Sequence, residues 1–526
     1  MKKLNDLQYL KLSKSAAFGY NLKLFFLSTF PHWIWNKMIL GFWGLVVNFF
    51  RGIADGCKDI ATTFMKGNWA VKLSFFLFGV GNIYYGQVMR GLLFLLFELV
   101  FIAYMVLPSG GIHWISKCNF FQTGMTVGTE QGGFKEVTQY GETMKVWVAG
   151  DDSVKVLLYG LLTVLFIVAF IWTWCLQVKQ CRICMDITAQ GRKIKSAKDD
   201  LRSLVDDEFH KTLLALPLMG IMIFTVLPII YMVLIAFTSY DAAHDGYSNL
   251  FSWVGLDNFN KLFDFGQGGL GLAFGEILSW TLMWSFFATF SNYFLGMFVA
   301  MMINKKGIRG KKFWRTALVM TIAIPQFVSL MYVSKLFDSS GIIGDLLDNI
   351  PAIKSWLDAN HYISIWESPT VARVMVIVIN IWVGIPYMML QATGILMNIP
   401  ADLYESSRVD GASPWQQYIR ITMPYMLFVT GPSLLTSFVG NLNNFNVIYL
   451  LTGGGPSNVD IGYAGGASVG HSDLLITWLF KIALASPESL YYMASVIGIL
   501  IFVVCAVLSL IVYNVIPSTK NEEDFS

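Results

Sequence analysis

A series of long apolar runs constrains this chain more than any other feature, because each run is close to the ~20 residues that an α-helix needs to cross a bilayer. The chain has 526 residues, of which 55% are hydrophobic and only 13% charged, and its mean hydropathy is +0.57. Soluble proteins carry about 25% charged residues. The alternation that is typical of outer-membrane barrel strands is not present in the sequence. We therefore predict an all-α polytopic membrane protein with about eight spanning helices, at 91–107, 156–174, 213–237, 277–303, 317–337, 371–396, 425–451 and 492–515.

The charges of the loops predict the side of the membrane on which each loop lies. Basic residues are concentrated in 1–70, 178–211 and 304–312, and the positive-inside rule assigns such loops to the cytoplasm. The loop 108–155 is acidic on balance and is expected outside. This pattern places both termini in the cytoplasm, together with the polar stretch Ala401–Pro424. The expected location is the cytoplasmic membrane.

The N-terminal region allows more than one interpretation. Residues 38–50 form an apolar stretch too short for a comfortable span, so we expect helices that lie in the membrane interface. Residues 73–87, punctuated by glycines, are expected to form a short re-entrant or interfacial hairpin before the first span. If both segments crossed, two spans would be added. Glu98 lies inside the first span, where an ionisable group is costly and needs a polar partner.

These features predict four regions in the chain. The external loop 108–155 is expected to form a small β-rich cap, because 146–148 reads as a strand between two glycines. The predicted regions are 1–72, cytoplasmic or interfacial; 73–211, an accessory membrane region that includes this loop; 212–516, a transport core; and 517–526, a cytoplasmic tail.

No active site or metal site is evident in the sequence. Cys181 and Cys184 form a CxxC pair, but no second CxxC or histidine pair accompanies it, so we expect free thiols rather than a zinc or redox site. The six histidines are scattered over different segments. The formal net charge of +3 gives no reason to expect nucleic acid as a partner.

The stretch Ala401–Pro424 is polar and lies between two predicted spans. Gly411 permits a left-handed turn and Pro414 cannot continue a helix, so we predict a short helix, a turn and a second helix. Such a shape beside a membrane could dock into a partner, or it could be an ordinary interfacial helix. Leu403, Tyr404, Val409 and Ala412 are expected near one face, while Asp402, Glu405, Arg408 and Asp410 are expected in water.

This stretch resembles the cytoplasmic coupling loop of ABC-importer permeases. The family's Glu-Ala-Ala is Glu405-Ser406-Ser407 here, followed after three residues by Gly411 and after nine more by Ile421-Thr422-Met423-Pro424. The spacing is intact, and small residues remain small. The resemblance implies that the helix sits in a groove of a cytoplasmic ATPase and transmits its closure to the membrane. The implied coupling residues are Glu405, Ser406, Ser407, Asp410, Gly411 and Ala412.

The two spans that flank this stretch contain uncharged polar residues at helical spacing. Asn380, Gly384 and Tyr387 recur at four and three residues in the first span, so they share a face. A neutral polyhydroxyl ligand needs such groups, because amides bond its hydroxyls and an aromatic ring covers its apolar face. The alternative is that these amides join helices to one another. The second span holds Ser437, Gly440, Asn441 and Asn444.

Further segments extend the resemblance over roughly 213–515 to the MalF-type subunit of maltose and maltodextrin importers. They read LPIIYMVLIAFTSY, GLDNF, INIWVGIPYMMLQATGIL and NNFNVIYLLTGGGP. The resemblance implies the type I ABC-importer (MetI-like) fold, and a sugar site at Asn380, Gly384, Tyr387, Ser437, Gly440, Asn441 and Asn444. Two features depart from the family: a large external domain is replaced by the short segment 241–275, and Gly440 stands where an aromatic residue stacks on sugar.

The same resemblance implies the partners. They are a MalG-like second permease, two cytoplasmic ATPases, an extracytoplasmic sugar-binding protein and the maltose or maltodextrin that is carried. The chain has no GxxxxGK[ST] sequence, so ATP and magnesium are expected on the ATPases, with no cofactor on this chain. Two alternatives remain: another cargo, such as a different oligosaccharide or glycerol phosphate, and a secondary transporter or channel that works alone.

Overall fold

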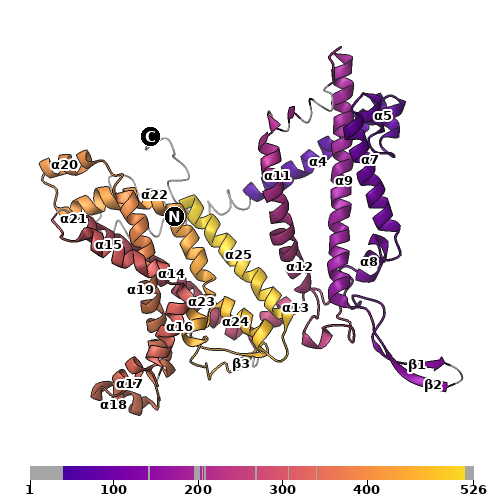
Figure 1. Ribbon diagram of the computed structural model, residues 1–526. Helices are drawn as coiled ribbons and strands as arrows, with labels where there is room; N and C mark the ends of the chain where they lie inside the picture. Colours follow the sequence, from indigo (N-terminus) through magenta and orange to yellow (C-terminus); the bar gives the residue numbers. More distant parts are fainter. Residues whose placement is uncertain are drawn as a thin grey trace, which may run out of the picture. The chain divides into compact units, whose positions relative to one another are not determined.

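The computed structural model describes residues 40–139, 142–194, 199, 202–203, 205–206, 209–266, 269–305, 307–338 and 340–515. The chain divides into two compact units (Figure 1). Unit 1 contains residues 1–113 and 161–219, and unit 2 contains 114–160 and 220–526. The two units are described separately, and the predicted boundaries after 72, 211 and 516 stay predictions.

Among the described residues, six helices are long and apolar enough to cross a membrane, which confirms an all-α polytopic architecture. In the described part of the chain, the strands form only two short hairpins. Six of the predicted spans correspond to these helices. They are α7 (Val88–Val106), α9 (Ser153–Ala189), α11 with η3 and α12 (Phe209–Ile235), α14 (Leu270–Asn304), α19 (Pro369–Leu396) and α25 (Tyr491–Val515, apolar over Tyr491–Ile511).

The other two predicted spans, 317–337 and 425–451, are each interrupted by a break between two helices. Between α15 (Lys311–Met320) with η5 (Thr321–Ala323) and α16 (Gln326–Phe337) the chain bends by 91° at Pro325. Proline lacks the N–H that a continuing helix needs and disfavours helical geometry in the residue before it. The second interruption separates α22 (Met423–Leu442) from α23 (Phe445–Thr452), where the Asn444 side chain accepts the Val447 N–H at 3.2 Å and starts a new helix.

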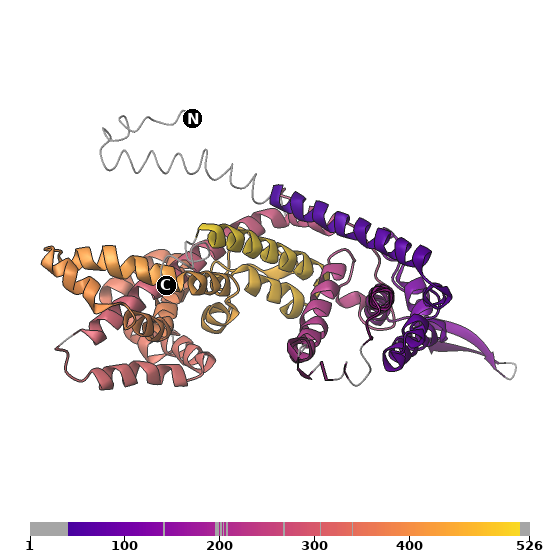
Figure 2. The ribbon, with the colours of Figure 1, turned by 90° about the horizontal axis from the view of Figure 1, so that it is seen from above.

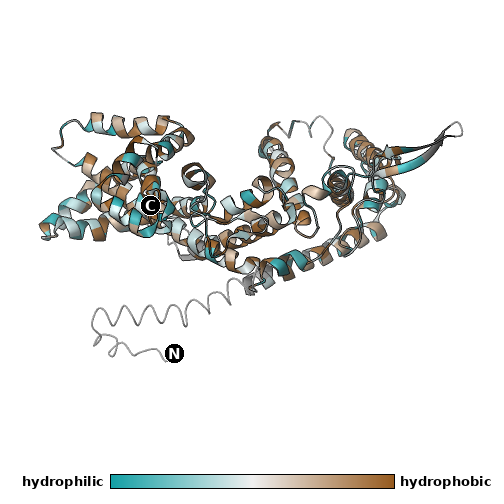
Figure 3. Cartoon of the chain, turned by 90° about the horizontal axis from the view of Figure 1, so that it is seen from below, coloured by the Kyte–Doolittle hydropathy of each residue, from teal (hydrophilic) through white to brown (hydrophobic). Residues whose placement is uncertain are grey.

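The described part of unit 1 begins with α4 (Leu40–Lys66), a single long helix (Figure 2) that carries both hydrophilic and hydrophobic residues along its length (Figure 3). It is not among the candidate spans, as the sequence predicted. Two short helices, α5 (Trp69–Leu73) and α6 (Val80–Tyr84), precede α7. Each is too short to span a membrane, which agrees with the predicted hairpin.

Glu98 of α7 has the polar partner that its position required. Its carboxylate is 5% exposed and accepts the backbone N–H of Phe78 at 2.8 Å. The next N–H, of Gly79, donates to Gln177 at 3.2 Å, and Gln177 also donates to the Ser74 carbonyl. The hairpin is therefore held to α7 and α9 by side chains that satisfy its exposed backbone, as a membrane protein requires.

In the same unit, Cys181 and Cys184 of the CxxC pair are both buried, and neither forms a disulfide bond. The Cys181 sulfur lies 3.5 Å from the Ser74 hydroxyl and from the amide oxygen of Asn82. The Cys184 sulfur lies 3.5 Å from the amide oxygen of Gln87. Both thiols therefore contact the segment that runs from the end of α5 to the start of α7.

In unit 2, two loops that are distant in sequence form a small cap. Bridges join Thr126 to Ser252 and Thr238 to Trp253, and the Trp253 indole donates to the Cys118 carbonyl at 2.8 Å. From this cap projects the antiparallel hairpin of β1 (Gly133–Gln139) and β2 (Glu142–Val148), which confirms the strand predicted at 146–148.

Asp151 fastens the base of this hairpin. It pairs with Lys117 at 2.7 Å and accepts the backbone N–H groups of Thr129 and Glu130 at 2.9 and 3.1 Å. Burial opposes its ionisation, but these hydrogen bonds outweigh burial and lower the pKa of Asp151 to about 2.

The rest of unit 2 is organised around α14. One set of its residues, including Trp284 and Ala288, packs with Val376 and Ile379 of α19. Further along, its residue Met297 packs with Met389 of α19 and with α22. The segment α24 (Leu475–Phe480) and α25 pack on the beginning of α14. The two helices that carry the predicted sugar-site residues are therefore both held against α14.

Candidate functional site

The predicted helix–turn–helix is present at one end of unit 2 (Figure 1). The helix α20 (Ala401–Val409) ends at Asp410, and Gly411 has φ +79°, the left-handed conformation expected of it. The helix α21 (Pro414–Gln417) then begins with a capping box, in which Ser413 and Gln416 each bond the other's backbone N–H. A π-helical turn, Tyr418–Thr422, leads directly into α22.

Side chains brace α20 against α21 and α22. The Gln417 amide donates to the Tyr404 carbonyl at 3.2 Å and to the Ser407 hydroxyl at 2.8 Å. The Tyr404 and Thr422 hydroxyls are 2.8 Å apart. The helix α20 is therefore fastened to Thr422, the residue that precedes α22.

The outer surface of this segment is exposed and partly apolar. Asp402, Glu405, Arg408 and Asp410 are exposed, as expected, and so are Ser406 and Gly411, while Ala412 and Ser407 are half-buried. The expectation of one shared apolar face was wrong, because Tyr404 turns inward while Val409 is 88% exposed and Leu403 46%. Trp415 of α21 is 67% exposed beside them. Apolar groups displayed in this way favour a docking surface over a solvated turn.

The basic loop 304–312 lies at the same end of unit 2 as this segment. The Asn304 amide lies 3.5 Å from the hydroxyl of Thr393, near the end of α19, and accepts a hydrogen bond from Arg315 at 2.9 Å. This proximity agrees with the prediction that both segments face the same compartment.

A stripe of buried polar residues on α14 faces the two other helices, and sequence reasoning missed it. Thr281, Ser285, Thr289 and Asn292 are all at most 6% exposed and recur at four, four and three residues. The signal was available, since polar residues at helical spacing in an apolar span mark a face turned to protein.

Asn292 occupies the space beside Gly384. Its amide donates to the Ala288 carbonyl at 2.8 Å and reaches the Asn380 carbonyl at 3.4 Å. A Cβ at Gly384 would lie 2.6 Å or less from all three atoms of the Asn292 amide group. Among the described residues, neither the Asn380 side-chain nitrogen nor the Asn292 side-chain oxygen has a hydrogen-bond partner. This part of the face holds unused hydrogen-bonding capacity.

The second pair of predicted residues meets the next turn of α14. Asn441 donates to the Thr289 hydroxyl at 3.0 Å and accepts from Asn444 at 3.2 Å. The Trp284 indole donates to the Asn441 carbonyl at 3.1 Å. Asn441 and Asn444 thus form one connected network across α14 and the break between α22 and α23.

The remaining three predicted residues lie apart from these contacts. Tyr387 is 52% exposed and lines a small pocket with Gln326, Ser329, Trp382 and residues near the bend at Pro325. Ser437 is half-buried, and Gly440 is exposed, with no atom within 4 Å of a Cβ placed there. Within the described part of the chain, the seven residues therefore do not meet in one closed cavity. Asn380 and Gly384 contact Asn292, Asn441 and Asn444 contact each other, and the other three lie apart.

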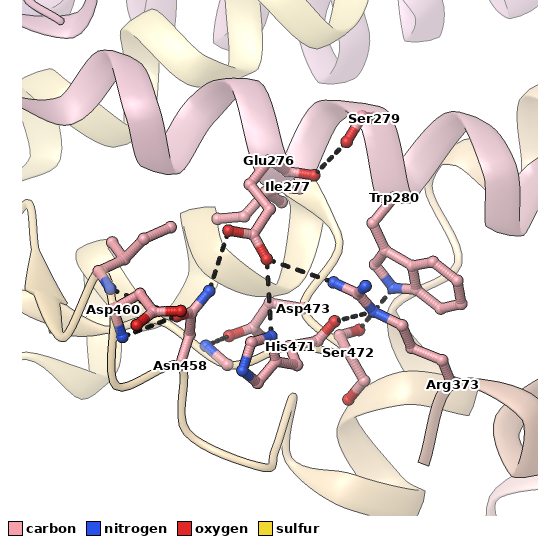
Figure 4. A network of polar contacts seen from close by, with 12 residues as sticks. Glu276, Ile277, Ser279, Trp280, Arg373, Asn458, Asp460, His471, Ser472 and Asp473 are labelled. Carbon is pink, nitrogen blue, oxygen red and sulfur yellow. Dashed lines mark hydrogen bonds and ion pairs between the residues drawn. The ribbon is translucent and has the colours of Figure 1, made fainter. Parts of the chain in front are cut away.

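A charged network closes the other end of α14 and α19 (Figure 4). Glu276 at the start of α14 accepts from Asn458 at 3.0 Å and lies 3.4 Å from Arg373 and 3.5 Å from His471. Arg373 also donates to the His471 carbonyl at 2.7 Å and stacks over Trp280 at 4.8 Å. These contacts fix the loop after α23, and they engage the one cation that either flanking span contains.

Comparison with known proteins gives concordant results. Residues 292–521 match the family described as binding-protein-dependent transport system inner membrane component. The maltodextrin transport system permease protein MdxF of Bacillus subtilis (strain 168) is 30% identical over 385 residues, covering 72% of this chain and 85% of that protein. The galactooligosaccharides transport system permease protein GanP of the same strain is 31% identical over 391 residues, covering 72% and 87%. The maltodextrin transport system permease protein MalC of Streptococcus pneumoniae serotype 4 is 29% identical over 451 residues, covering 85% and 95%.

Two relatives of at least 30% identity match this chain over most of their own length, and the family match runs from Asn292, within α14, through the end of α25. The multi-pass helical architecture agrees with it. This chain therefore belongs to the family of binding-protein-dependent transport permeases, and it is a multi-pass membrane permease subunit rather than an enzyme.

Proposed function

We propose that this chain is one of two permease subunits of an ATP-driven importer for maltose and maltodextrins. The observation that carries the proposal is the exposed α20–turn–α21 segment, which displays Val409 and Trp415 and is braced through Tyr404 and Thr422 to the start of α22. A surface that is apolar, rigid and continuous with a transmembrane helix is suited to receive force from a partner.

In the proposed mechanism, two cytoplasmic ATPases hold ATP and magnesium, and one of them receives α20 in a groove. Closure of the ATPases displaces α20, and the Tyr404–Thr422 contact carries that displacement into α22. At the far end of α22, Asn441 bonds Thr289 of α14, so the same displacement changes the packing of the polar face. A MalG-like second permease supplies the other half of the path, and an extracytoplasmic binding protein delivers the sugar.

The chemistry of the predicted sugar-site residues supports a neutral cargo. Asn380, Asn441, Asn444 and Tyr387 offer amides and an aromatic ring, which suit hydroxyls and the apolar side of a sugar ring. A phosphorylated cargo needs a cation, but Arg373 is engaged with Glu276 and with the His471 carbonyl. MdxF and MalC, named for maltodextrin, support this choice, whereas GanP identifies galacto-oligosaccharides as the cargo to compare.

The orientation follows from the loops and the coupling segment together. We place α20, the 304–312 loop and both termini in the cytoplasm. A secondary transporter that works alone is disfavoured, because it would need an ionisable group in the membrane to couple transport to an ion. Glu98, the ionisable residue noted in the first predicted span, is instead bonded to a backbone N–H of the hairpin.

The test is the ATPase activity of the complex that co-purifies with this chain, reconstituted with its binding protein. The complex is titrated with glucose, maltose, maltotriose, longer maltodextrins and a galacto-oligosaccharide. We expect stimulation by maltose or longer glucans and not by the galacto-oligosaccharide. If only the galacto-oligosaccharide stimulates, the cargo is wrong and the importer stands; if no ATPase co-purifies, the importer itself is refuted.

Two matched substitutions test the coupling surface. Glu405→Lys reverses an exposed charge on α20, and we expect loss of sugar-stimulated ATPase activity by at least about tenfold, the equivalent of roughly 1.4 kcal/mol of docking energy. Asp358→Lys makes the same change at an exposed position of α18 (Pro351–Asn360), outside the coupling segment, and should leave activity unchanged. Equal effects of the two would remove the assignment of α20.

A further inference from the structure

Unit 1 contains a cavity that the transport mechanism does not use. It lies among the first turn of α7, the last turns of α9, and the first turn of α11 (Phe209–Ile221), and its volume of about 430 Å³ falls in the range of small-ligand sites. Figure 1 shows these three helix ends toward the top of the view. Arg192, Lys193 and Ile194, which follow α9, form part of the wall.

Positive charge dominates the lining of this cavity. Arg90, Arg192, Lys193 and Lys211 line it, and no carboxylate is among its described lining residues. Arg192 and Lys193 are exposed, and their side chains are open to a ligand. Arg90 donates to Gln180 at 3.0 Å, and both Arg90 and Lys211 have further contacts in the chain.

The position of the cavity relates it to the membrane surface. The apolar stretch of α7 begins at Val88, next to Arg90, and that of α11 begins at Phe209, next to Lys211. The cavity therefore lies where two candidate spans start, at the depth of lipid headgroups. Its wall is not uniformly polar, because Ile183, Ile187 and Ile194 line it as well.

We propose that this cavity binds the headgroup of an anionic phospholipid from the bilayer. The four cations suit a phosphate and its glycerol, and the isoleucines suit the adjoining acyl chain. A soluble phosphate would use the cations and gain nothing from the apolar wall, and it would not be concentrated at the start of the spans. The loop charges assign this end to the cytoplasmic face, where anionic lipids attract basic clusters.

Native mass spectrometry of the intact importer complex tests the proposal. The complex in neutral detergent is titrated with phosphatidylglycerol and, separately, with phosphatidylcholine. We expect one phosphatidylglycerol molecule to bind selectively. The pair Arg192→Gln with Lys193→Gln removes two charges and should weaken that binding about 30-fold. Each cation near the membrane surface contributes about 1 kcal/mol, and about 1.4 kcal/mol corresponds to a tenfold change in affinity.

Two control proteins separate charge from structure. The pair Lys58→Gln with Lys66→Gln removes the same charge from exposed positions of α4 in the same unit, outside the lining, and should bind as the unmodified complex does. The exchange Arg192→Lys with Lys193→Arg keeps both charges and should retain most of the binding. Equal binding of the two lipids, or unchanged binding in the glutamine pair, overturns the proposal.

Soluble competitors decide the source of the phosphate. Inorganic phosphate and glycerol 3-phosphate are added at millimolar concentration to the lipid-bound complex. Retention of the lipid supports the proposal, because the acyl chain contributes to binding. Displacement of the lipid by either competitor shows that the site selects a soluble anion and overturns the assignment to a phospholipid.

Discussion

Replacing Gly384 by alanine tests whether the polar face of α14 is as tightly fitted as its geometry indicates. The new Cβ would lie 2.6 Å or less from the nitrogen, carbon and oxygen of the Asn292 amide. Asn292 is 6% exposed, so its amide can move only by giving up its bonds to the Ala288 and Asn380 carbonyls. The helix spacing or the Asn292 rotamer must change.

The expected change in the free energy of unfolding follows from the loss of those two hydrogen bonds and from the helix propensity of the backbone. Each lost hydrogen bond costs about 1 kcal/mol net, and leaving a buried amide unpaired costs about 1–3 kcal/mol. Alanine in a helix recovers about 1 kcal/mol relative to glycine. We expect a net loss of about 2 kcal/mol, which corresponds to a fall in the unfolding midpoint of roughly 2–4 °C for a unit of this size.

The assay uses the cysteines of the chain. Cys118, Cys181, Cys184 and Cys505 are buried, so a thiol-reactive fluorescent dye reports their exposure as the detergent-solubilised complex is heated. Gly440→Ala is the matched control, because no atom lies within 4 Å of its new Cβ, and its midpoint should not fall. In Asn292→Ala with Gly384→Ala the clash is gone, so the combined loss should be smaller than the sum of the single losses by about 0.5–3 kcal/mol. Equal midpoints for Gly384→Ala and Gly440→Ala would refute the reasoning.

Three further predictions concern other parts of the fold. The pKa of Asp151 is lowered to about 2 from an ordinary 3.8, so its contribution to stability is complete above about pH 4 and is lost as the pH falls toward 2. Asp151→Asn should remove about 2 kcal/mol of cap stability at pH 7 and flatten this acid dependence in thermal scans. An unchanged pH profile would contradict the pairing with Lys117. Glu98→Gln keeps an acceptor for the hairpin N–H and should preserve the unfolding midpoint, whereas Glu98→Leu leaves that N–H unpaired and should lower stability by about 1–3 kcal/mol, so equal midpoints would show that the bond is unimportant. Gly411→Ala places alanine in the left-handed conformation, which costs about 1–2 kcal/mol, and should reduce sugar-stimulated ATPase activity. Gly394 is a helical glycine with equally open surroundings, so Gly394→Ala should leave that activity unchanged. Equal activities of the two variants would show that the turn geometry is not needed for coupling.

Several local features were predictable from the sequence because short-range chemistry decides them. Gly411 and Pro414 predicted the turn, and the turn is present with the expected left-handed glycine. The cost of a charge in an apolar span predicted a polar partner for Glu98, but the partner, a backbone N–H twenty residues earlier, depends on how the hairpin folds back. The sugar-binding and coupling roles predicted for residues of the two flanking spans and of Ala401–Pro424 stay predictions.

Where the sequence was misleading, the cause was a competition between local signals. The runs 317–337 and 425–451 are apolar enough to suggest continuous spans, but Pro325 and the side chain of Asn444 each favour ending one helix and starting another. By its spacing Val409 fits an apolar face shared with Tyr404. In the structure the Tyr404 hydroxyl contacts the Thr422 hydroxyl and Tyr404 points inward, while Val409 is exposed.

The sequence by itself determined the membrane class, the candidate spans and the family resemblance, because apolar length, loop charge and motif spacing can be read along one chain. Only the tertiary structure decided which polar groups meet. Asn292 fills the space left by Gly384, Thr289 joins Asn441, and four cations line one cavity in unit 1. These are contacts between residues distant in sequence, and a one-dimensional pattern carries no information on which faces of separate helices pack against each other.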